Sequence, residues 1–399
     1  MLEIIKESVI SFGTILIALM LNIASVFGIS HTSYEQASKQ IAKQDSSIVE
    51  NTAPEKIPKT PVIEKETEIK TKESINNEKG LEVKKERQSK NTDEVTNSVK
   101  AQIIIPPQNT PAPSIDSDKL NEIARNALVN VICTTKSSGP FNPSSGSGII
   151  IDPRGIVLTN AHVAQYFLLE KYKGQDFMDC ILRTGSPAYP SYDAEILYIS
   201  PAWIKENKRN IILDNPTGTG ENDFALLRIN KHIRDGINLP DKFPSVEIEM
   251  SEGNMVKNTE VLIVGYPAGF LGGTAIQKNL WPVTTFSYIT NIFTFVSGTL
   301  DLVSLNGNIA AQKGSSGGGV INTQNGKLIG IIVTSTEAEQ TGDRILNAIT
   351  STHINRSIFS EIGMNLETYL SGDLVARADN FNQTVSPSLT ELLEAVLEK

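Results

Sequence analysis

The sequence predicts an all-β fold of two similar halves, a sandwich or barrels, behind an apolar N-terminal segment and a polar linker. Short β-branched runs separated by Gly, Pro, Asn and Asp recur from residue 129 to residue 349. No long helical pattern interrupts these runs. They fall into two sets that divide near residues 239–253, and each set has about the length that one small barrel needs.

Composition narrows the class of protein. Of 399 residues, 39% are apolar and 20% are charged, which is typical of a chain with a globular body. The net charge of -9 argues against nucleic acid as a partner, because phosphate binding needs a basic face. No phosphate-binding glycine motif occurs, and the four histidines and two cysteines do not lie at metal-ligand spacing. We therefore expect neither a metal nor a cofactor.

Residues 1–30 are expected to form a membrane anchor or a signal segment. The stretch from 9 to 29 is almost wholly apolar and has no ionisable side chain. Its length of about 20 residues suits a bilayer-crossing helix, whereas a signal-peptide core usually has about 7–15. No A-x-A-like cleavage site follows, so an uncleaved anchor is favoured over a cleaved signal.

Residues 31–115 read as a disordered linker rich in Lys, Glu and Pro. Large apolar residues are scarce, so the segment cannot bury enough surface to offset its ordering entropy. PPQNTPAP, from Pro106 to Pro113, ends it as a stiffer spacer. A flexible coil of this length has an end-to-end distance of about 50 Å.

The globular domain is expected over residues 116–365. Asp116 or Ser117 would cap a short helix over KLNEIARNAL. Barrel 1 is expected over about 129–240 and barrel 2 over about 254–350. INRSIFSEIGMNLETYL and SLTELLEAVLEK have helical character, and residues 366–399 are expected to form a C-terminal helical tail.

Three short motifs carry chemistry: LTNAHV around His162, NDFALLRI around Asp223, and GSSGGG around Ser316. A serine hydroxyl needs an adjacent base, histidine titrates near neutral pH, and a carboxylate fixes the imidazole tautomer. Glycines around the serine permit a backbone that directs two N–H groups, those of Gly314 and Ser316, at a developing oxyanion. Alone, each motif also fits a structural histidine, a turn acid or a glycine-rich turn.

With these motifs in view, the chain resembles the trypsin-like, chymotrypsin-fold serine peptidases, nearest the bacterial HtrA type. GSGIIIDPRGIVLTNAHV, DFALLRI, VLIVGYPAG and GSSGGGVINTQNGKLIGIIV carry the resemblance, and the order His, Asp, Ser agrees with the family. It implies two six-stranded antiparallel β-barrels, with His162 as general base, Asp223 as orienting acid and Ser316 as nucleophile. Gly314 and Ser316 would supply the oxyanion hole.

The resemblance also implies roles for residues near the triad. The G-x-S-G-G register selects Ser316 over Ser315, and Asp193 and Asp214 are rival acids. The substrate-binding positions would be Ala310, at the base of the pocket, and Val333, Thr334 and Ser335, which would pair with an extended polypeptide. Because Ala310 cannot pair with a basic side chain, we expect cleavage after small or medium apolar residues.

Gln312 and Lys313 differ from the residues that usually precede the nucleophile in this family, so the sequence leaves open the conformation of the oxyanion loop in the absence of substrate.

In the family's first barrel the strands carrying Cys133 and Cys180 are neighbours. A disulfide and two buried free thiols therefore remain as alternatives. Residues after 349 are too few for the PDZ domain that HtrA-type enzymes usually carry.

The sequence therefore predicts a serine endopeptidase that acts on polypeptides. It is expected either to be anchored in a membrane, with the peptidase domain outside the cytoplasm, or to be secreted if the N-terminal segment is cleaved. A catalytically inactive trypsin-like fold that acts as a tethered peptide-binding module is the main alternative. An esterase that shares the triad is a third hypothesis.

Overall fold

The computed structural model describes residues 115–135, 144–172, 177–213, 216–295, 298–335 and 343–398. The expected membrane segment over residues 1–30, and all of the expected linker except its last residue, lie outside these ranges. Within the described ranges, no helix has the length and apolar character needed to cross a bilayer.

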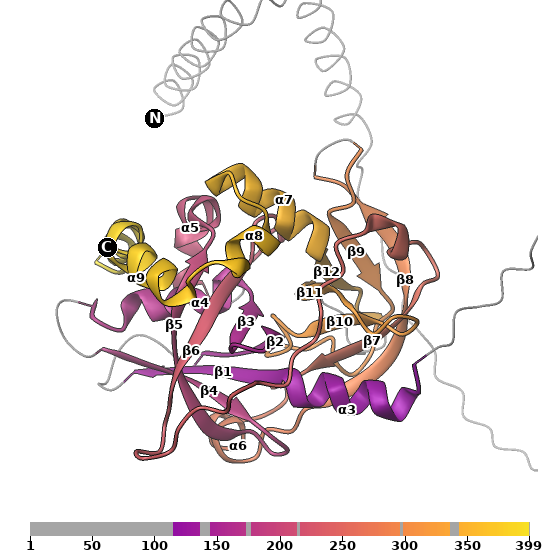
Figure 1. Ribbon diagram of the computed structural model, residues 1–399, viewed down its shortest axis with the longest axis horizontal. Helices are drawn as coiled ribbons and strands as arrows, with labels where there is room; N and C mark the ends of the chain where they lie inside the picture. The colour runs from indigo at the N-terminus through magenta and orange to yellow at the C-terminus, as the bar shows by residue number, and fades with distance from the viewer. Residues whose placement is uncertain are drawn as a thin grey trace, which may run out of the picture. The chain divides into compact units, whose positions relative to one another are not determined.

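The first half of the domain is a closed antiparallel barrel, with strand order β1-β2-β3-β6-β5-β4. Figure 1 shows these strands in violet (β1) through magenta to rose (β6). Their bounds are β1 (Leu128–Thr135), β2 (Ser144–Asp152), β3 (Ile156–Thr159), β4 (Met178–Thr184), β5 (Tyr189–Ile199) and β6 (Ala225–His232).

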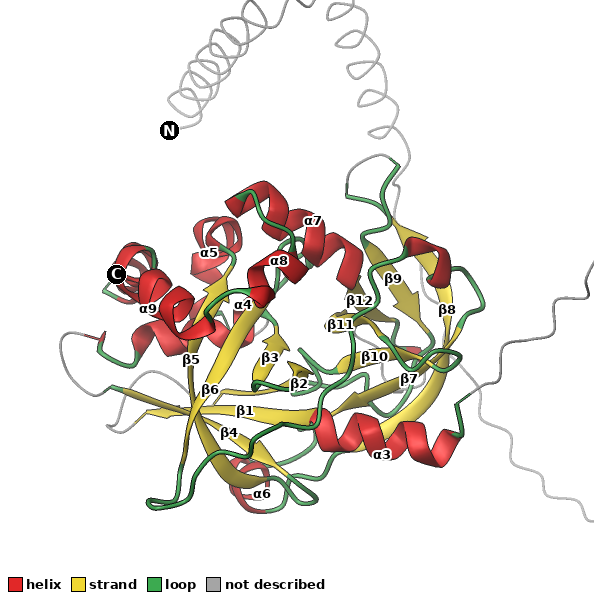
Figure 2. Cartoon of the chain, viewed as in Figure 1, coloured by secondary structure: helices red, strands yellow, loops and turns green. Residues whose placement is uncertain are grey.

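The second half repeats this arrangement, with order β10-β11-β12-β9-β8-β7. Its strands are β7 (Glu260–Gly265), β8 (Val283–Phe293), β9 (Leu302–Leu305), β10 (Gly319–Asn322), β11 (Leu328–Ser335) and β12 (Leu346–Thr350). Two closed six-stranded antiparallel barrels confirm the predicted all-β architecture (Figure 2). Each β-branched run of the sequence forms one of these strands.

Helices flank the barrels. Helix α3 (Ser117–Ala127) begins at Asp116, whose side chain accepts hydrogen bonds from the N–H groups of Asp118 and Lys119, as capping residues do. Between β5 and β6 lie α5 (Pro201–Asn207) and η3 (Lys208–Ile212), which the sequence pattern did not reveal. The remaining short elements are α4 (Ala161–Ala164), η1 (Gln165–Leu169), η4 (Glu252–Asn254) and α6 (Gly273–Lys278).

Four helices follow the second barrel: α7 (Ser351–Ile362), α8 (Leu366–Ser371), α9 (Leu374–Thr384) and α10 (Ser386–Leu397). The chain returns to barrel 1, where α9 packs on β5 (Figure 1). Helix α10 packs on η1, η3 and α5. Leu389 and Leu393 of α10 are buried there. Helix α9, which was not predicted as a separate element, supplies the buried Phe381.

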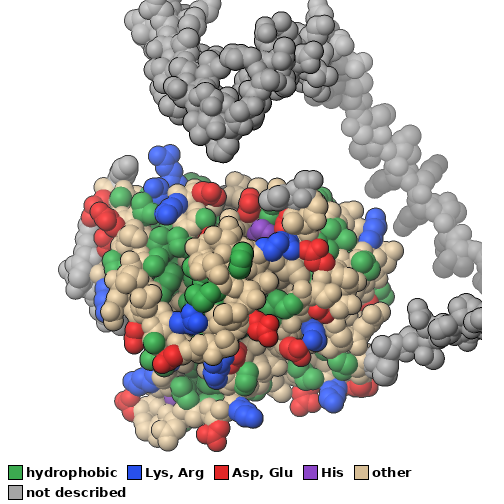
Figure 3. Space-filling model, turned by 45° about the horizontal axis from the view of Figure 1, so that its top comes forward, with side chains coloured by type: hydrophobic (Ala, Val, Ile, Leu, Met, Phe, Trp, Pro, Cys, Tyr) green, Lys and Arg blue, Asp and Glu red, His purple; other side chains and the backbone are tan. Residues whose placement is uncertain are grey.

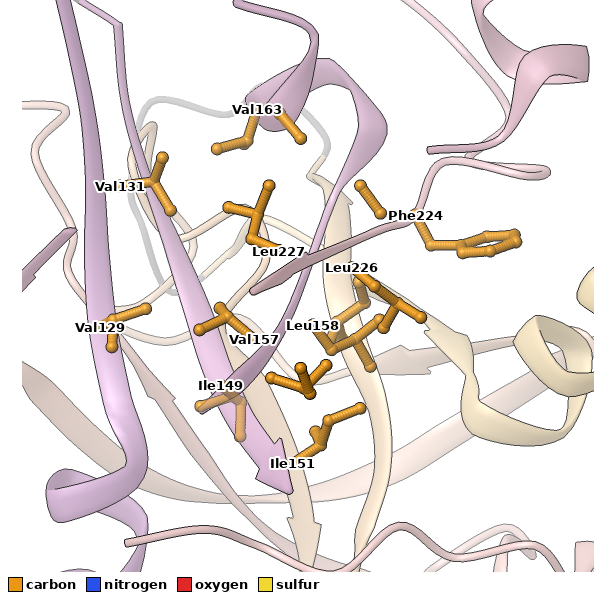
Figure 4. Packing of buried hydrophobic residues seen from close by; sticks show 14 of the residues in the cluster. Val129, Val131, Ile149, Ile151, Val157, Leu158, Val163, Phe224, Leu226 and Leu227 are labelled. Carbon is orange, nitrogen blue, oxygen red and sulfur yellow. The ribbon is translucent and has the colours of Figure 1, made fainter. Parts of the chain in front are cut away.

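Burial explains why the strands read as nearly continuous apolar runs. One cluster of buried side chains fills barrel 1 and continues beneath the C-terminal helices, and a second cluster fills barrel 2. Figure 4 shows part of the first cluster, in which Val129, Ile149, Val157 and Leu227 come from four strands of barrel 1. On the face shown in Figure 3, acidic and basic side chains are interspersed with apolar ones.

A disulfide joins Cys133 of β1 to Cys180 of β4, and the two residues are register partners in the sheet, with Cα atoms 4.1 Å apart. Of the two alternatives that the sequence left open, the structure has the paired form. The bond links two neighbouring strands of barrel 1.

Candidate active site

Strand pairing brings His162 next to Asp223, although 61 residues separate them in sequence. Strand β3 pairs with β6 so that Thr159 lies opposite Ala225. His162 follows β3 on the one-turn helix α4, and Asp223 precedes β6. The end of β3 and the start of its paired strand β6 therefore place both side chains at the same edge of barrel 1.

Two contacts with Asp223 fix the orientation of His162. Asp223 Oδ2 lies 2.7 Å from His162 Nδ1, and Asp223 Oδ1 accepts a hydrogen bond of 2.9 Å from the His162 main-chain N–H. The Asn160 side-chain amide donates to the Asp223 carbonyl at 2.8 Å. With both carboxylate oxygens committed, the imidazole is held by Nδ1, which leaves Nε2 as the atom available for proton transfer.

Burial and charge act in opposite directions on His162. Burial lowers the pKa of its imidazole. The charge of Asp223 and the hydrogen bond to Asp223 raise that pKa by more than burial lowers it, so the pKa of His162 lies above its ordinary value. The Asp223 side chain is 7% exposed and the His162 side chain is 31% exposed. The imidazole thus has one side against a buried carboxylate and one side accessible from solvent.

Glycine is required on both sides of the predicted nucleophile turn. Gly314 and Gly317 have φ values of +94° and +82°, in the left-handed region. A Cβ atom at Gly317 would lie only 2.1 Å from the Ser147 carbonyl oxygen and 2.5 Å from Thr159 Oγ1. The turn therefore packs closely against the end of β3, three residues before His162.

Ser147 of β2 holds this turn from the opposite barrel, and sequence reasoning missed it. Its main-chain N–H donates to the Ser316 carbonyl at 2.7 Å, and its Oγ donates to the Gly314 carbonyl at 2.8 Å. The same Oγ accepts from the Tyr266 N–H at 2.8 Å. The one available signal was a serine between two glycines at the start of a buried strand, GSG.

The carbonyl of Lys313 fixes the direction of the Gly314 N–H. Lys313 O accepts a hydrogen bond of 2.7 Å from the Ala268 N–H. In a trans peptide the C=O and N–H point in opposite directions, so the Gly314 N–H points away from Ala268. Among the described residues, neither this N–H nor that of Ser316 has a hydrogen-bond acceptor. Two unused donors on one tight turn are the arrangement that an oxyanion needs.

The two adjacent serines have different environments. Ser315 is fully buried, and its Oγ has no hydrogen-bond partner, whereas Ser316 is partly exposed. Within the described ranges, Ser316 Oγ makes no hydrogen bond, including with His162. Catalytic hydrogen bonds of unliganded sites are often long and shorten in the substrate complex.

The predicted substrate-binding residues lie in and beside barrel 2. Ala310 is fully buried in the barrel 2 core. Val333 interrupts the register of β11 with β12, and its side chain packs beside Gly220, before Asp223. Thr334 Oγ1 accepts from Asn347 Nδ2 at 3.1 Å, and Ser335 ends β11. The β11 segment thus runs close to the residues that precede Asp223.

Of the two rival acids, Asp193 takes no part in this pair. Asp193 lies within β5, where its register partners are Ile181 and Lys231. Asp214 lies outside the described residues. A second buried His–Asp pair, His353 with Asp301 at 3.0 Å, anchors α7 beside β9.

Two cavities lie among the described residues, and none of the predicted site residues lines either of them. One of them, of about 560 Å³, lies between α3 and the turn between β4 and β5. Within the described ranges, no group of His, Cys, Asp and Glu side chains is arranged to hold a metal ion.

Comparison with known proteins agrees with this fold. Residues 146–331 match the family model of the trypsin-like peptidase domain, a range that begins beside Ser147 and includes His162, Asp223 and Ser316. No curated protein matches the chain.

Solved structures that match the chain include HtrA-type proteases and Deg5. The HtrA-type protease AlgW with tripeptide is 20% identical over 62% of this chain and 64% of its own, with a TM-score of 0.38. Deg5 is 15% identical over 61% of this chain and 94% of its own, with a TM-score of 0.39. The chain thus spans less than two thirds of the AlgW chain.

Proposed function

This chain carries a trypsin-like peptidase domain, and from that premise we propose that it is a serine endopeptidase with Ser316 as its nucleophile. The observation that carries the proposal is the turn from Gly314 to Ser316. It presents two unused N–H groups and packs against the strand that leads to the His162–Asp223 pair. An arrangement of this kind suits acyl transfer to a serine hydroxyl.

In the proposed reaction, His162 Nε2 takes the proton of Ser316 Oγ as that oxygen forms a bond to the substrate carbonyl carbon. The carbonyl oxygen becomes an oxyanion and accepts hydrogen bonds from the N–H groups of Gly314 and Ser316. Each such donor typically contributes about 2.7–4 kcal/mol in the transition state. Asp223 stabilises the imidazolium, which then protonates the leaving amine as the C–N bond breaks.

An acyl-enzyme on Ser316 remains after the amine departs. Water then attacks the ester carbonyl, with His162 again taking a proton, and the Ser316 oxygen leaves and regains it. The charge of Asp223 raises the pKa of His162 against the effect of burial, which favours proton transfer to the imidazole.

The substrate proposed is an extended polypeptide that pairs with Val333 to Ser335 as an added strand. A register irregularity at Val333 takes this residue out of the β11–β12 ladder, which supports a role for its main chain in pairing with substrate. Small or medium apolar residues are proposed before the cleaved bond, since Ala310 offers no charge to a basic side chain. Action outside the cytoplasm is proposed from the apolar N-terminal segment and the Cys133–Cys180 disulfide.

Labelling with a fluorophosphonate probe tests the nucleophile directly. The full-length protein is incubated with the probe, and the modified residue is mapped by mass spectrometry beside Ser316→Ala and Ser315→Ala variants. We expect labelling on Ser316 that Ser316→Ala abolishes and Ser315→Ala retains, because the Ser315 hydroxyl is buried.

An internally quenched peptide library, with the termini of the products sequenced, then measures specificity. Cleavage after small or medium apolar residues is the expected outcome. Folded protein that neither labels nor cleaves, yet retains extended peptides, would instead support the inactive peptide-binding module and overturn the proposal.

A further inference from the structure

The segment from Tyr266 to Pro282 supports the nucleophile turn from outside, and we call it the support loop. Its Ala268 N–H donates to the Lys313 carbonyl at 2.7 Å, which fixes the direction of the Gly314 N–H. Contact is close at Gly269 as well, where a Cβ atom would lie 3.2 Å from Lys313 N. The position of the Gly314 donor therefore depends on the position of this loop.

The support loop is itself held mainly by barrel 1. Arg183 Nη1 donates to the carbonyls of Ile276 and Gln277, both at 2.9 Å, at the C-terminal end of α6. The Ala188 N–H donates to the Leu280 carbonyl at 2.7 Å. Tyr266 donates its hydroxyl to the Gly185 carbonyl at 2.7 Å, and Arg125 Nη2 donates to the Pro282 carbonyl at 3.2 Å.

Arg183 also reaches the second support of the turn, the start of β2. Its Nε donates to Asn130 Oδ1 at 2.8 Å. The amide of the fully buried Asn130 donates in turn to the Gly146 carbonyl at 2.6 Å and to Ser145 Oγ at 3.0 Å. These residues immediately precede Ser147, which binds the carbonyls of Gly314 and Ser316.

One side chain thus connects both structures that hold the turn. Arg183 is 2% exposed, and all its acceptors among the described residues are neutral oxygens, with Nη2 left without a partner. A buried guanidinium without a carboxylate partner is unfavourable for folding unless its N–H groups are hydrogen-bonded, and here three neutral oxygens accept from it. The planar fork of Arg reaches three acceptors in fixed directions, which an ammonium group does not.

We propose that Arg183 is a positioning residue for the oxyanion hole, which it aligns through the support loop and through Asn130. This inference rests on the proposed function of the Gly314–Ser316 turn. Arg183 touches no reacting atom, so its removal weakens transition-state binding and leaves substrate binding nearly intact. Loss of a whole oxyanion donor lowers kcat by about 10²–10³-fold, so misalignment through Arg183 is expected to lower it by about 10- to 100-fold.

The test compares Arg183→Met, Arg183→Lys and a control, Arg228→Met, in the full-length protein. Arg228 is another arginine of barrel 1, with a partly buried side chain, but it pairs with Glu195 and donates no hydrogen bond to the support loop. We measure kcat and KM on one cleaved peptide, together with hydrogen exchange of pepsin fragments that cover residues 266–282 and 308–318.

In Arg183→Met we expect kcat to fall by about 10- to 100-fold with KM within about threefold of wild type. Exchange should accelerate at the Ala268 amide and at the hydrogen-bonded Ser315 and Gly317 amides of the turn. Arg183→Lys keeps the charge but not the fork, so it should show the same loss in smaller degree. Arg228→Met should leave the kcat of the folded enzyme and both exchange signals unchanged.

Equal kcat in folded Arg183→Met and wild type, or unchanged exchange in both fragments, would overturn the role of Arg183. A wild type that neither cleaves nor labels would overturn the proposed function instead. The exchange measurement needs no activity, so it tests the link between Arg183 and the turn in either case. If Arg183→Met does not fold, Arg183→Lys and its exchange pattern decide.

Discussion

Ser147 and Ser315 provide a matched test of how the nucleophile turn is stabilised. Both serines are fully buried, and the Ser→Ala substitution removes the same atom from each. Ser147 Oγ serves the Gly314 carbonyl and the Tyr266 N–H, whereas Ser315 Oγ has no partner. The same chemical change should therefore affect stability in opposite directions.

The magnitudes follow from the groups left unpaired. Ser147→Ala leaves one buried carbonyl and one buried N–H without a partner, at about 1–3 kcal/mol each, so we expect a loss of about 2–4 kcal/mol after partial relaxation. Ser315→Ala removes a hydroxyl that is buried without a hydrogen bond, so we expect no loss and a gain of up to about 1 kcal/mol.

Urea unfolding of the full-length protein, followed by tryptophan fluorescence, measures both effects. Trp203 is 4% exposed and Trp281 is 52% exposed, so Trp203 reports on unfolding of the core. With a slope of about 3 kcal/mol per M, Ser147→Ala should lower the midpoint by about 1 M. Similar midpoints for the two variants, or a lower midpoint for Ser315→Ala than for Ser147→Ala, would refute this account of the turn.

The remaining predictions concern the His–Asp pair and the disulfide. Because the pKa of His162 is raised, kcat/KM should decline on acidification from a pH above about 6.5, as a pH profile would show. A raised folded-state pKa contributes stability below about pH 6.5 that is lost as pH rises through the folded-state value. Asp223→Asn should therefore lower the urea midpoint more at pH 6 than at pH 9, and it should lower kcat by about 10⁴-fold; an equal shift at both pH values would contradict this assignment. The bond between Cys133 and Cys180 spans 47 residues, so the double Cys→Ala variant should lose about 4 kcal/mol in non-reducing urea titrations. Reduced wild type is the control, and an unchanged midpoint in the double variant would contradict the disulfide.

Much of the barrel architecture could be predicted from the sequence, because strands and turns carry local signals. The β-branched runs and the Gly, Pro, Asn and Asp residues between them report on backbone conformation within a few residues. The short insertion helix α5 was missed because its seven residues are too few to show a helical period. Helix α9 has no strong apolar stripe and is stabilised by its contact with β5.

The sequence by itself determined which residue types could do chemistry and in what order they occur. His162, Asp223 and Ser316 stand in local patterns, and the glycines of the turn are recognisable because a positive φ restricts the residue type. The GSG pattern was the one local signal for Ser147, and no local pattern pointed to Arg183. Ser147 meets Gly314 across 167 residues, and Arg183 meets Ile276 across 93.

Only the tertiary structure decided these partners, because a hydrogen bond between distant segments depends on the register of both barrels and on how they pack. The same reason applies to the Cys133–Cys180 bond, whose alternative of free thiols the sequence left open and the pairing of β1 with β4 decided. The direction of the Gly314 N–H also depends on such a contact, because Ala268 of another loop holds the Lys313 carbonyl.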